Sequence, residues 1–212
     1  MRTGEVFALT WDDVDFENRT IRVNKTVYCK IKDNKGRWFL GTTKTDGSSR
    51  IIYMSDTLYK ILSKFKEYQN INRKLYKNKY KYYYLEHVKN KYGKLIEYKI
   101  IEGKNKNNKV EMIFVKKDGT YVGTDITKYP YRIIHNELKI NCRFYDLRGS
   151  FATKVLRSGI EIKDVSTVLG HSKIETTENY YITSTKDTLK KVSESFEKEI
   201  DLDIISRNII DD

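Results

Sequence analysis

The sequence predicts an α+β fold that is mainly helical, with a small antiparallel three-stranded sheet on one edge. Between positions 20 and 53, short runs rich in alternating apolar and β-branched residues are separated by turn residues. From position 55 onward, apolar residues recur mostly at helical spacing. With 39% hydrophobic residues among 212, the chain can bury the core of one large domain or two small ones.

The N-terminal quarter supplies the sheet. Residues 1–9 are expected to form the end of a helix, and 11–15 a polar turn into the sheet. Three acids in that turn could bind a divalent ion. No matching acidic cluster follows, so a turn capped by Asp side chains is the preferred interpretation. The expected strands, which form an antiparallel meander, are 20–28, 37–40 and 50–53.

The middle of the chain combines a helix with an inserted β-element. Ser55 can cap a helix whose apolar face would hold Leu58, Ile61, Leu62, Phe65 and Tyr68. Segment 74–92, dense in Lys and Tyr, fits either a helix with half-buried tyrosines or a nucleic-acid contact. The inserted strands are expected at 98–102 and 110–115.

The C-terminal half is expected to be helical. Helix 145–157 should bury Leu147, Phe151, Val155 and Leu156, and Gly159 suits its end. Gly170 closes the next helix in the same way. The expected helices are 124–138 with an irregularity at Pro130, 145–157, 162–169, 174–181 and 185–200.

The chain is strongly basic, with a net charge of +12. This surplus favours a polyanionic partner, nucleic acid first and an acidic membrane second. A lysine-rich surface without such a partner fits the composition equally well. Cys29 and Cys142 match no metal-ligand spacing, and the sequence has no signal peptide or long apolar run. We therefore expect a reduced, cytoplasmic protein that does not bind a membrane.

Residue types suited to phosphoryl transfer are concentrated near the C-terminus. Arg148 can contact a phosphate in a bidentate manner, and His171 is a donor near neutral pH. Tyr180 carries a hydroxyl that can form a covalent ester. Arg2 near the start and Lys44 in a predicted hairpin tip add two cations. Together these are the parts of a phosphoryl-transfer site that uses no metal ion.

In this order, the residues resemble the catalytic domain of the tyrosine recombinase (phage integrase) family. The resemblance covers roughly residues 1–184 and begins with Arg2-Thr-Gly-Glu5. It continues with Tyr145-Asp-Leu-Arg148 and Val168-Leu-Gly-His-Ser172, and ends with Tyr180 nine positions after His171. Each piece alone is common, but the order of all of them is specific.

The resemblance implies a role for each residue in cutting DNA. Arg2 and Arg148 would clamp the non-bridging oxygens of the scissile phosphate, and His171 would donate to it. Tyr180 would attack the phosphorus to form a 3′-phosphotyrosyl link. Lys44 would protonate the leaving 5′ oxygen. The resemblance implies no cofactor, because two guanidiniums take the place of metal ions.

One position departs from the family pattern. Tyr145 stands where the family usually has His, and Gly149, after Arg148, stands where it often has another His. A phenol with a pKa of about 10 is a poor base at neutral pH, but it can still donate or relay a hydrogen bond. Glu5, one helical turn after Arg2, is expected to orient an arginine or the side chain at 145, although a surface carboxylate also fits.

The resemblance also predicts the domain organisation. Residues 1–184 would form the catalytic domain, and 185–212 a C-terminal helix and tail. The family usually has a separate DNA-binding domain before its first arginine, whereas here the sequence starts at Met1. We therefore expect a shortened expression segment or a truncated reading frame. The expected C-terminal helix carries an apolar stripe that consists of Leu189, Val192, Phe196 and Ile200. We expect this stripe to support self-association on double-stranded DNA.

The function expected from the resemblance is that of an integrase from a mobile element, which cuts and rejoins DNA at specific sites. A catalytically decayed relative that only binds DNA is the main alternative, and it would form no covalent adduct. A topoisomerase of the same chemistry would relax supercoils without pairing sites. A generic RNA-binding protein would not need these residues in this order.

Overall fold

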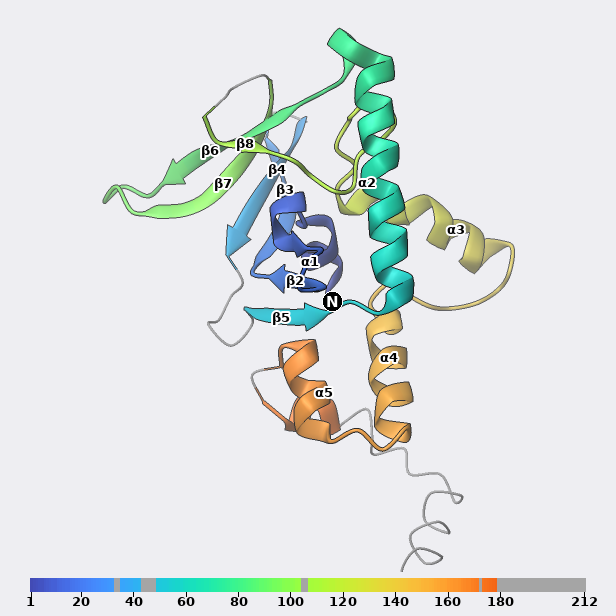
Figure 1. The fold of residues 1–212 in the computed structure, drawn as a ribbon. Helices are drawn as coiled ribbons and strands as arrows, with labels where there is room; N and C mark the ends of the chain where they lie inside the picture. Colours follow the sequence, from blue (N-terminus) through green and yellow to red (C-terminus); the bar gives the residue numbers. More distant parts are fainter. Residues whose placement is uncertain (33–34, 43–48, 104–106, 172, 179–212) are drawn as a thin grey trace, which may run out of the picture.

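The computed structural model describes residues 1–32, 35–42, 49–103, 107–171 and 173–178. Two antiparallel sheets and a long helix, α2, surround the short N-terminal helix α1 (Figure 1). The helices α4 and α5 lie beyond strand β5, at the opposite end from the long β6–β7 hairpin (Figure 1). This combination of helices and antiparallel sheets confirms the predicted fold class.

The first sheet has three strands in the order β1-β2-β5. After α1 (Thr3–Phe7) and a 3-10 turn, η1 (Trp11–Asp13), the chain enters it. The polar turn forms as expected, because Asp13 accepts hydrogen bonds from the backbone N and hydroxyl of Thr10. The strands are β1 (Val14–Asp15), β2 (Thr20–Val23) and β5 (Arg50–Tyr53).

The predicted meander is wrong in its pairing, because the run 20–28 divides at Asn24 into strands of two different sheets. Its first part, β2, pairs directly with β5. Its second part begins β3 (Lys25–Lys32), which pairs with β4 (Lys35–Thr42) in the second sheet. In the sequence, the β3–β4 hairpin therefore lies between β2 and β5, which are neighbours in the first sheet.

The second sheet has five strands in the order β3-β4-β7-β6-β8. It contains β6 (Tyr83–Lys89), β7 (Leu95–Glu102) and β8 (Lys109–Val110). A helix through 74–92 was the wrong prediction. Lys77, at φ 47°, ends the preceding helix, a 3-10 turn η3 (Lys77–Lys79) follows, and the chain then forms strand β6, which pairs with β7. Tyrosines favour this half-buried, pleated setting. The inserted β-element is confirmed, although β8 is shorter than the expected 110–115.

Helix α2 (Asp56–Tyr76) begins as predicted, since the Ser55 side chain accepts a hydrogen bond from the Leu58 backbone N. Its buried face differs from the expected stripe. Leu62 is buried, but Ile61 and Tyr68 are exposed. Buried Gln69 instead accepts a hydrogen bond of 2.8 Å from the indole Nε1 of Trp11. This polar pair ties α2 to the first sheet's core.

After the sheets, η4 (Thr124–Thr127) leads into α3 (Lys128–Asn136). The helix expected at 124–138 is therefore divided, and Pro130 lies just after the division, in the first turn of α3, where a proline removes no intrahelical hydrogen bond. The remaining described helices are α4 (Asp146–Arg157), α5 (Ile162–Leu169) and α6 (Glu175–Glu178).

The buried face of α4 is only partly the predicted one. Leu156 is buried and Val155 packs partly against the same cluster, as expected. Leu147 and Phe151 are exposed, and Arg148 and Ala152 are buried in their place. Arg148, Ala152 and Leu156 follow one another at intervals of four residues, and adjacent positions on a helix point about 100° apart. The helix therefore turns the guanidinium of Arg148 inward together with its apolar stripe.

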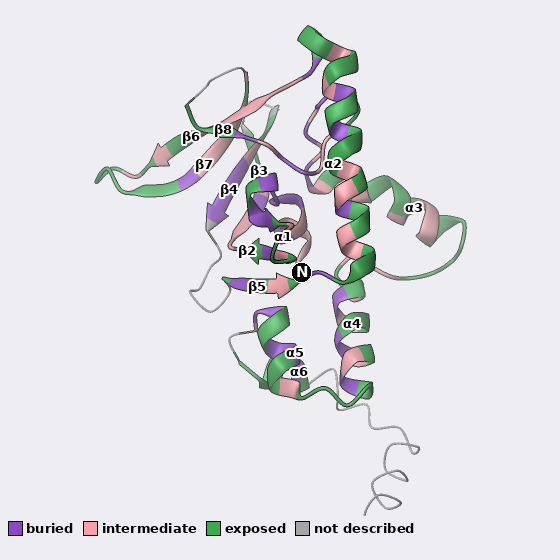
Figure 2. Cartoon of the chain, viewed as in Figure 1, coloured by how far each residue is buried: buried purple, intermediate pink, exposed green. Residues whose placement is uncertain are grey.

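Buried residues gather between the two sheets and α1, along α2, and between α4 and α5 (Figure 2). The α4–α5 cluster is separate from the other two and holds Ala152, Leu156, Val165 and Leu169. No helix among the described residues is long and apolar enough to span a lipid bilayer.

Candidate active site

Arg2 and Glu5 lie together at the start of helix α1. Arg2 is the residue before the first turn, and its backbone N donates to Glu5 Oε2 at 2.7 Å. Its side chain donates from Nη1 to Glu5 Oε1 at 2.9 Å. Glu5 is almost fully buried, whereas the Arg2 side chain is 41% exposed and can reach a ligand. The expected contact between Glu5 and an arginine is present.

A second arginine shares Glu5. Arg50, the first residue of β5, donates from Nη2 and Nη1 to the two Glu5 oxygens at 2.9 and 3.3 Å. Burial raises the pKa of Glu5, but hydrogen bonds from Arg50 and Arg2 outweigh it and hold that pKa at about 2. The carboxylate is therefore ionised at neutral pH. Sequence analysis missed Arg50, because only the strand pairing reveals which way this residue faces.

Arg148 on α4 is 3% exposed. Its Nη2 donates to the Leu169 carbonyl at 2.5 Å, while its Nε and Nη1 have no hydrogen-bond partner among the described residues. Burial and the nearby charge of Arg2 lower the pKa of Arg148. Buried N–H groups without partners are rare, because each costs about 1–3 kcal/mol. This guanidinium is thus held ready for an acceptor that the described residues do not supply.

His171 follows the end of α5. Gly170 adopts φ 69° there, in the left-handed region that suits glycine, and the His171 backbone N donates to Ser166 O at 3.1 Å. The imidazole Nδ1 lies 2.8 Å from the hydroxyl of Thr177, a fully buried residue of α6. Burial and the charges of Arg148, Arg2 and Arg50 lower the pKa of His171 to about 4. The ring is therefore neutral at pH 7.

No role for Thr177 was predicted from the sequence, although it lies between His171 and Tyr180, two residues of the expected site. If its hydroxyl donates to Nδ1, the proton of the neutral ring is on Nε2, which then acts as a donor. Such a fixed tautomer suits a histidine that must donate to an oxyanion.

Tyr145 lies directly before α4 and is 42% exposed. It lies close enough to Arg148 to act on its pKa in the raising direction, against the burial and the charge of Arg2, which lower that pKa. Lys44 and Tyr180 lie outside the described residues. The structure therefore brings together four of the predicted residues, with Tyr145 beside them: Arg2, Glu5, Arg148 and His171.

The family assignment follows from a match over almost the whole chain. Residues 1–187 match the phage integrase family. The chain belongs to this family. The assignment confirms the resemblance inferred from the order of Arg2, Arg148, His171 and Tyr180 in the sequence.

The curated relatives of this integrase-family chain are longer than it is. A XerC-like tyrosine recombinase of Caldanaerobacter subterraneus subsp. tengcongensis is 29% identical over 85% of this chain and 42% of the relative. The transposase from transposon Tn916 of Enterococcus faecalis is 24% identical over 94% of this chain and 43% of its own length. The chain thus spans less than half the length of these two relatives.

Among solved structures, the Tn1549 transposon integrase in complex with circular intermediate DNA has the same fold. The TM-score is 0.63 at 22% identity, over 92% of this chain and 56% of that one. A second structure, of XerA recombinase, gives a TM-score of 0.53 at 19% identity, over 92% of this chain and 53% of that chain. At these identities the likeness shows the fold alone.

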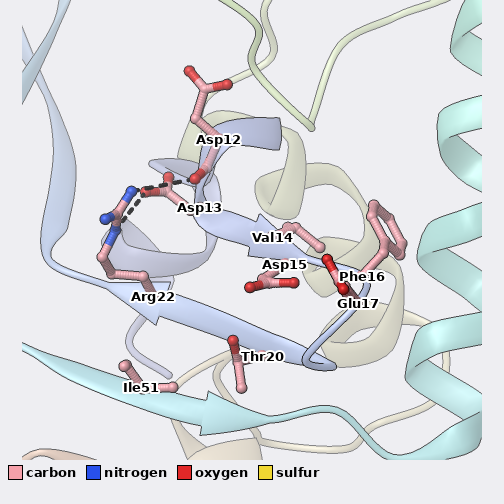
Figure 3. Close-up of a pocket in the computed structure, with 9 residues that line it drawn as sticks. All are labelled: Asp12, Asp13, Val14, Asp15, Phe16, Glu17, Thr20, Arg22 and Ile51. Carbon is pink, nitrogen blue, oxygen red and sulfur yellow. Dashed lines mark hydrogen bonds and ion pairs between the residues drawn. The ribbon is translucent and has the colours of Figure 1, made fainter.

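A pocket of about 580 Å³ lies away from these residues, beside β1 and β2 (Figure 3). Its lining is acidic, with Asp12, Asp13, Asp15 and Glu17. Asp13 is already bound to Lys25 at 2.8 Å. Among the described residues, no group of three acidic, His or Cys side chains is arranged to hold a metal ion. The pocket's negative charge disfavours a DNA backbone, so it is not the candidate site.

Proposed function

We propose that this chain is the catalytic part of a mobile-element integrase, which cuts and rejoins double-stranded DNA through a 3′-phosphotyrosyl intermediate. The observation that carries the proposal is the buried guanidinium of Arg148, two of whose nitrogens, Nε and Nη1, are left unpartnered by the described residues. A phosphate oxygen is the acceptor that such a guanidinium fits. Family membership supports the same chemistry.

The charge balance of the site favours a single phosphodiester. The guanidiniums of Arg2, Arg50 and Arg148 face one carboxylate, Glu5, and the imidazole of His171 is neutral. The surplus is about two positive charges before a ligand binds. As a phosphodiester is attacked and approaches its transition state, its negative charge rises from one towards two. The arginine cluster therefore stabilises the charge that develops. In this scheme Arg2 and Arg148 hold the non-bridging oxygens.

The proposed reaction balances without an external energy source. The Tyr180 oxygen attacks the phosphorus and its proton passes to solvent, relayed by the Tyr145 hydroxyl. The bond from phosphorus to the 5′ oxygen breaks, and Lys44 protonates that oxygen to leave a free 5′ hydroxyl. His171 donates to a non-bridging oxygen. Attack by a 5′ hydroxyl on the phosphotyrosyl ester reverses the sequence, so rejoining needs no nucleoside triphosphate.

We propose double-stranded DNA as the substrate because of the net charge of +12 and the arginine cluster. The structural neighbour from Tn1549 is itself a complex with DNA. Since the chain spans 42% of the XerC-like relative, we expect the 212 residues alone to bind DNA weakly and with little sequence preference. Self-association on DNA through the stripe at Leu189, Val192, Phe196 and Ile200 belongs to the same proposal.

The test is the covalent adduct itself. The 212-residue chain is incubated with nicked duplexes whose central sequence is randomised, so that the short 5′-hydroxyl fragment diffuses away after cleavage. A denaturing gel then shows protein linked to DNA. We expect Tyr180→Phe to remove the adduct and Tyr181→Phe to keep it, because Tyr180 stands at the nine-residue offset from His171 that carries the resemblance. Salt-sensitive binding without an adduct would instead identify the decayed relative, which the replacement of the usual His by Tyr145 favours.

Lys44 is tested with a modified substrate. A bridging sulfur at the 5′ position leaves as a thiolate and needs no general acid. We expect Lys44→Ala to cleave the ordinary duplex slowly and the sulfur-containing duplex at the wild-type rate. A matched control, Lys66→Ala on the exposed side of α2, should cleave both substrates like the wild type. Equal defects of Lys44→Ala on the two substrates would refute the role of general acid.

A further inference from the structure

We infer that Arg50 is a positioning residue of this site, which holds Glu5 and the end of α5 so that Arg2 and His171 stay in register with the phosphate. The inference rests on the proposed DNA-cleavage function. Arg50 itself is not one of the groups that this function requires to touch the phosphate. Its importance lies in the three elements that its guanidinium joins.

All three nitrogens of the Arg50 guanidinium are used for this purpose. Nη2 and Nη1 form a two-pronged contact with the Glu5 carboxylate at 2.9 and 3.3 Å. Nε donates to the Val168 carbonyl, in the last turn of α5, at 2.7 Å. The side chains of Arg50 and Glu5 are 4% and 2% exposed. A fork of this kind fixes orientation as well as distance, which a single ammonium cannot do.

The backbone beyond Val168 also depends on Arg50. A Cβ added at Gly170 would lie 2.9 Å from Arg50 Nη1 and 3.1 Å from its Cδ, so the guanidinium packs directly against this turn. Gly170 accepts a long hydrogen bond of 3.4 Å from Arg2 Nη2, and His171 is the next residue. Arg50 thus supports the turn that carries His171 from one side, while Arg2 contacts it from another.

Arg50 also lies close in the sequence to Lys44, the expected general acid. It pairs with Val23 as the first residue of β5, six positions after Lys44. The same guanidinium therefore couples α1, the end of α5 and the strand that follows the Lys44 segment.

The loss of Arg50 should also change how Arg2 is held. Glu5 now divides its charge between Arg50 and Arg2. Without Arg50, the buried carboxylate has Arg2 as its one remaining guanidinium partner among these contacts. Arg2 is then held to Glu5 and withdrawn from the phosphate. Removing the carboxylate as well should release Arg2, so a second substitution should repair part of the first defect.

The experiment compares five proteins by single-turnover adduct formation at saturating nicked duplex, with the duplex Kd measured in parallel. The proteins are the wild type, Arg50→Met, Arg50→Lys, Arg50→Met/Glu5→Gln and the control Arg22→Met. Arg22 lies on the neighbouring strand β2, is 58% exposed and takes no part in the site. Removing it tests for a general effect of losing an arginine from this sheet.

We expect Arg50→Met to slow the saturated rate by about 10- to 100-fold, somewhat less than losing an oxyanion donor outright. Its Kd should change less than about threefold, because many surface cations share DNA binding. Arg50→Lys should fall between, and Arg50→Met/Glu5→Gln should react faster than Arg50→Met. Arg22→Met should match the wild type.

Each contrary result has a definite meaning. A wild-type rate in Arg50→Met overturns the inference, and so does a double variant that is slower than Arg50→Met. If Arg50→Met does not fold, Arg50→Lys and the double variant decide the question by the same comparison of rates. A wild type that forms no adduct on any duplex refutes the proposed function itself, and the inference falls with it.

Discussion

Replacing Arg148 by methionine tests whether the site is built for a bound anion rather than for stability. The change keeps a long flexible side chain in the α4 helix and removes a guanidinium that is 3% exposed. If this charge serves only a ligand, the free protein gains stability when it is removed. If the charge is structural, the protein loses stability.

The expected gain follows from the contacts of the guanidinium. Nε and Nη1 are unpartnered among the described residues, and leaving each buried donor unsatisfied costs about 1–3 kcal/mol. The hydrogen bond from Nη2 to Leu169 O, with its charged donor, contributes about 1.5–3 kcal/mol in the other direction. The difference centres near 2 kcal/mol in favour of Arg148→Met, and relief of repulsion from Arg2 adds to it. For a chain of this size that corresponds to a rise in Tm of about 4–8 °C.

The assay pairs urea unfolding with adduct formation. Arg148→Met should unfold at a higher urea concentration than the wild type and form no adduct. The matched control is Arg143→Met, which removes an exposed arginine three residues before the same helix begins, where it binds Asp146, the first residue of the helix, at 3.0 Å. That surface pair contributes at most about 1 kcal/mol, so this variant should keep wild-type activity and nearly wild-type stability. An Arg148→Met protein less stable than the wild type would show that its donors are satisfied, and would refute the reasoning.

Three further predictions concern the histidine and tyrosine groups. Because the pKa of His171 falls from 6.5 to about 4 on folding, the unfolded state binds more protons between these values. The free energy of unfolding should therefore drop as the pH is lowered from 6.5 towards 4, and urea unfolding of His171→Gln should lack that share of the drop. Thr177→Val, which removes the hydroxyl beside Nδ1, should slow single-turnover cleavage about five- to tenfold, the value of one net hydrogen bond; an unchanged rate would argue against control of the tautomer. Tyr145→His should keep or raise the cleavage rate and move its pH optimum towards the imidazole range, whereas a dead Tyr145→His beside a fully active Tyr145→Phe would assign position 145 to packing.

Elements with a local cause were predictable from the sequence. The α2 helix starts after Ser55 because its side chain caps a backbone N–H, and α5 ends at Gly170 because the turn needs φ 69°. Each signal lies within a few residues of its effect. The family and the order of the site residues were likewise readable, since both are properties of the linear sequence.

Features set by contacts between distant residues were not predictable. Nothing in the run 20–28 shows that Asn24 separates two sheets, because the division depends on β5 replacing β3 as the neighbour of β2. The β6 strand was mistaken for a helix because its Lys and Tyr content is compatible with both, until pairing with β7 decides. On α4, the sequence favours burying Leu147, whereas the tertiary structure buries Arg148.

The properties of this site come from one cluster of charges, so they must change together. Burial together with guanidiniums held close to a single carboxylate accounts for the low pKa of His171, and the guanidiniums account for the low pKa of Glu5. The same burial leaves donors of Arg148 unpartnered among the described residues. A phosphate that binds there supplies the missing acceptors and partly cancels the positive potential at the imidazole. A bound phosphate should therefore raise the pKa of His171 above its value in the free protein at the same time as it satisfies Arg148. In the proposed reaction, the energetic cost in the free protein and the stabilisation of the transition state thus have the same physical origin, so we expect a substitution that relieves the first to remove the second.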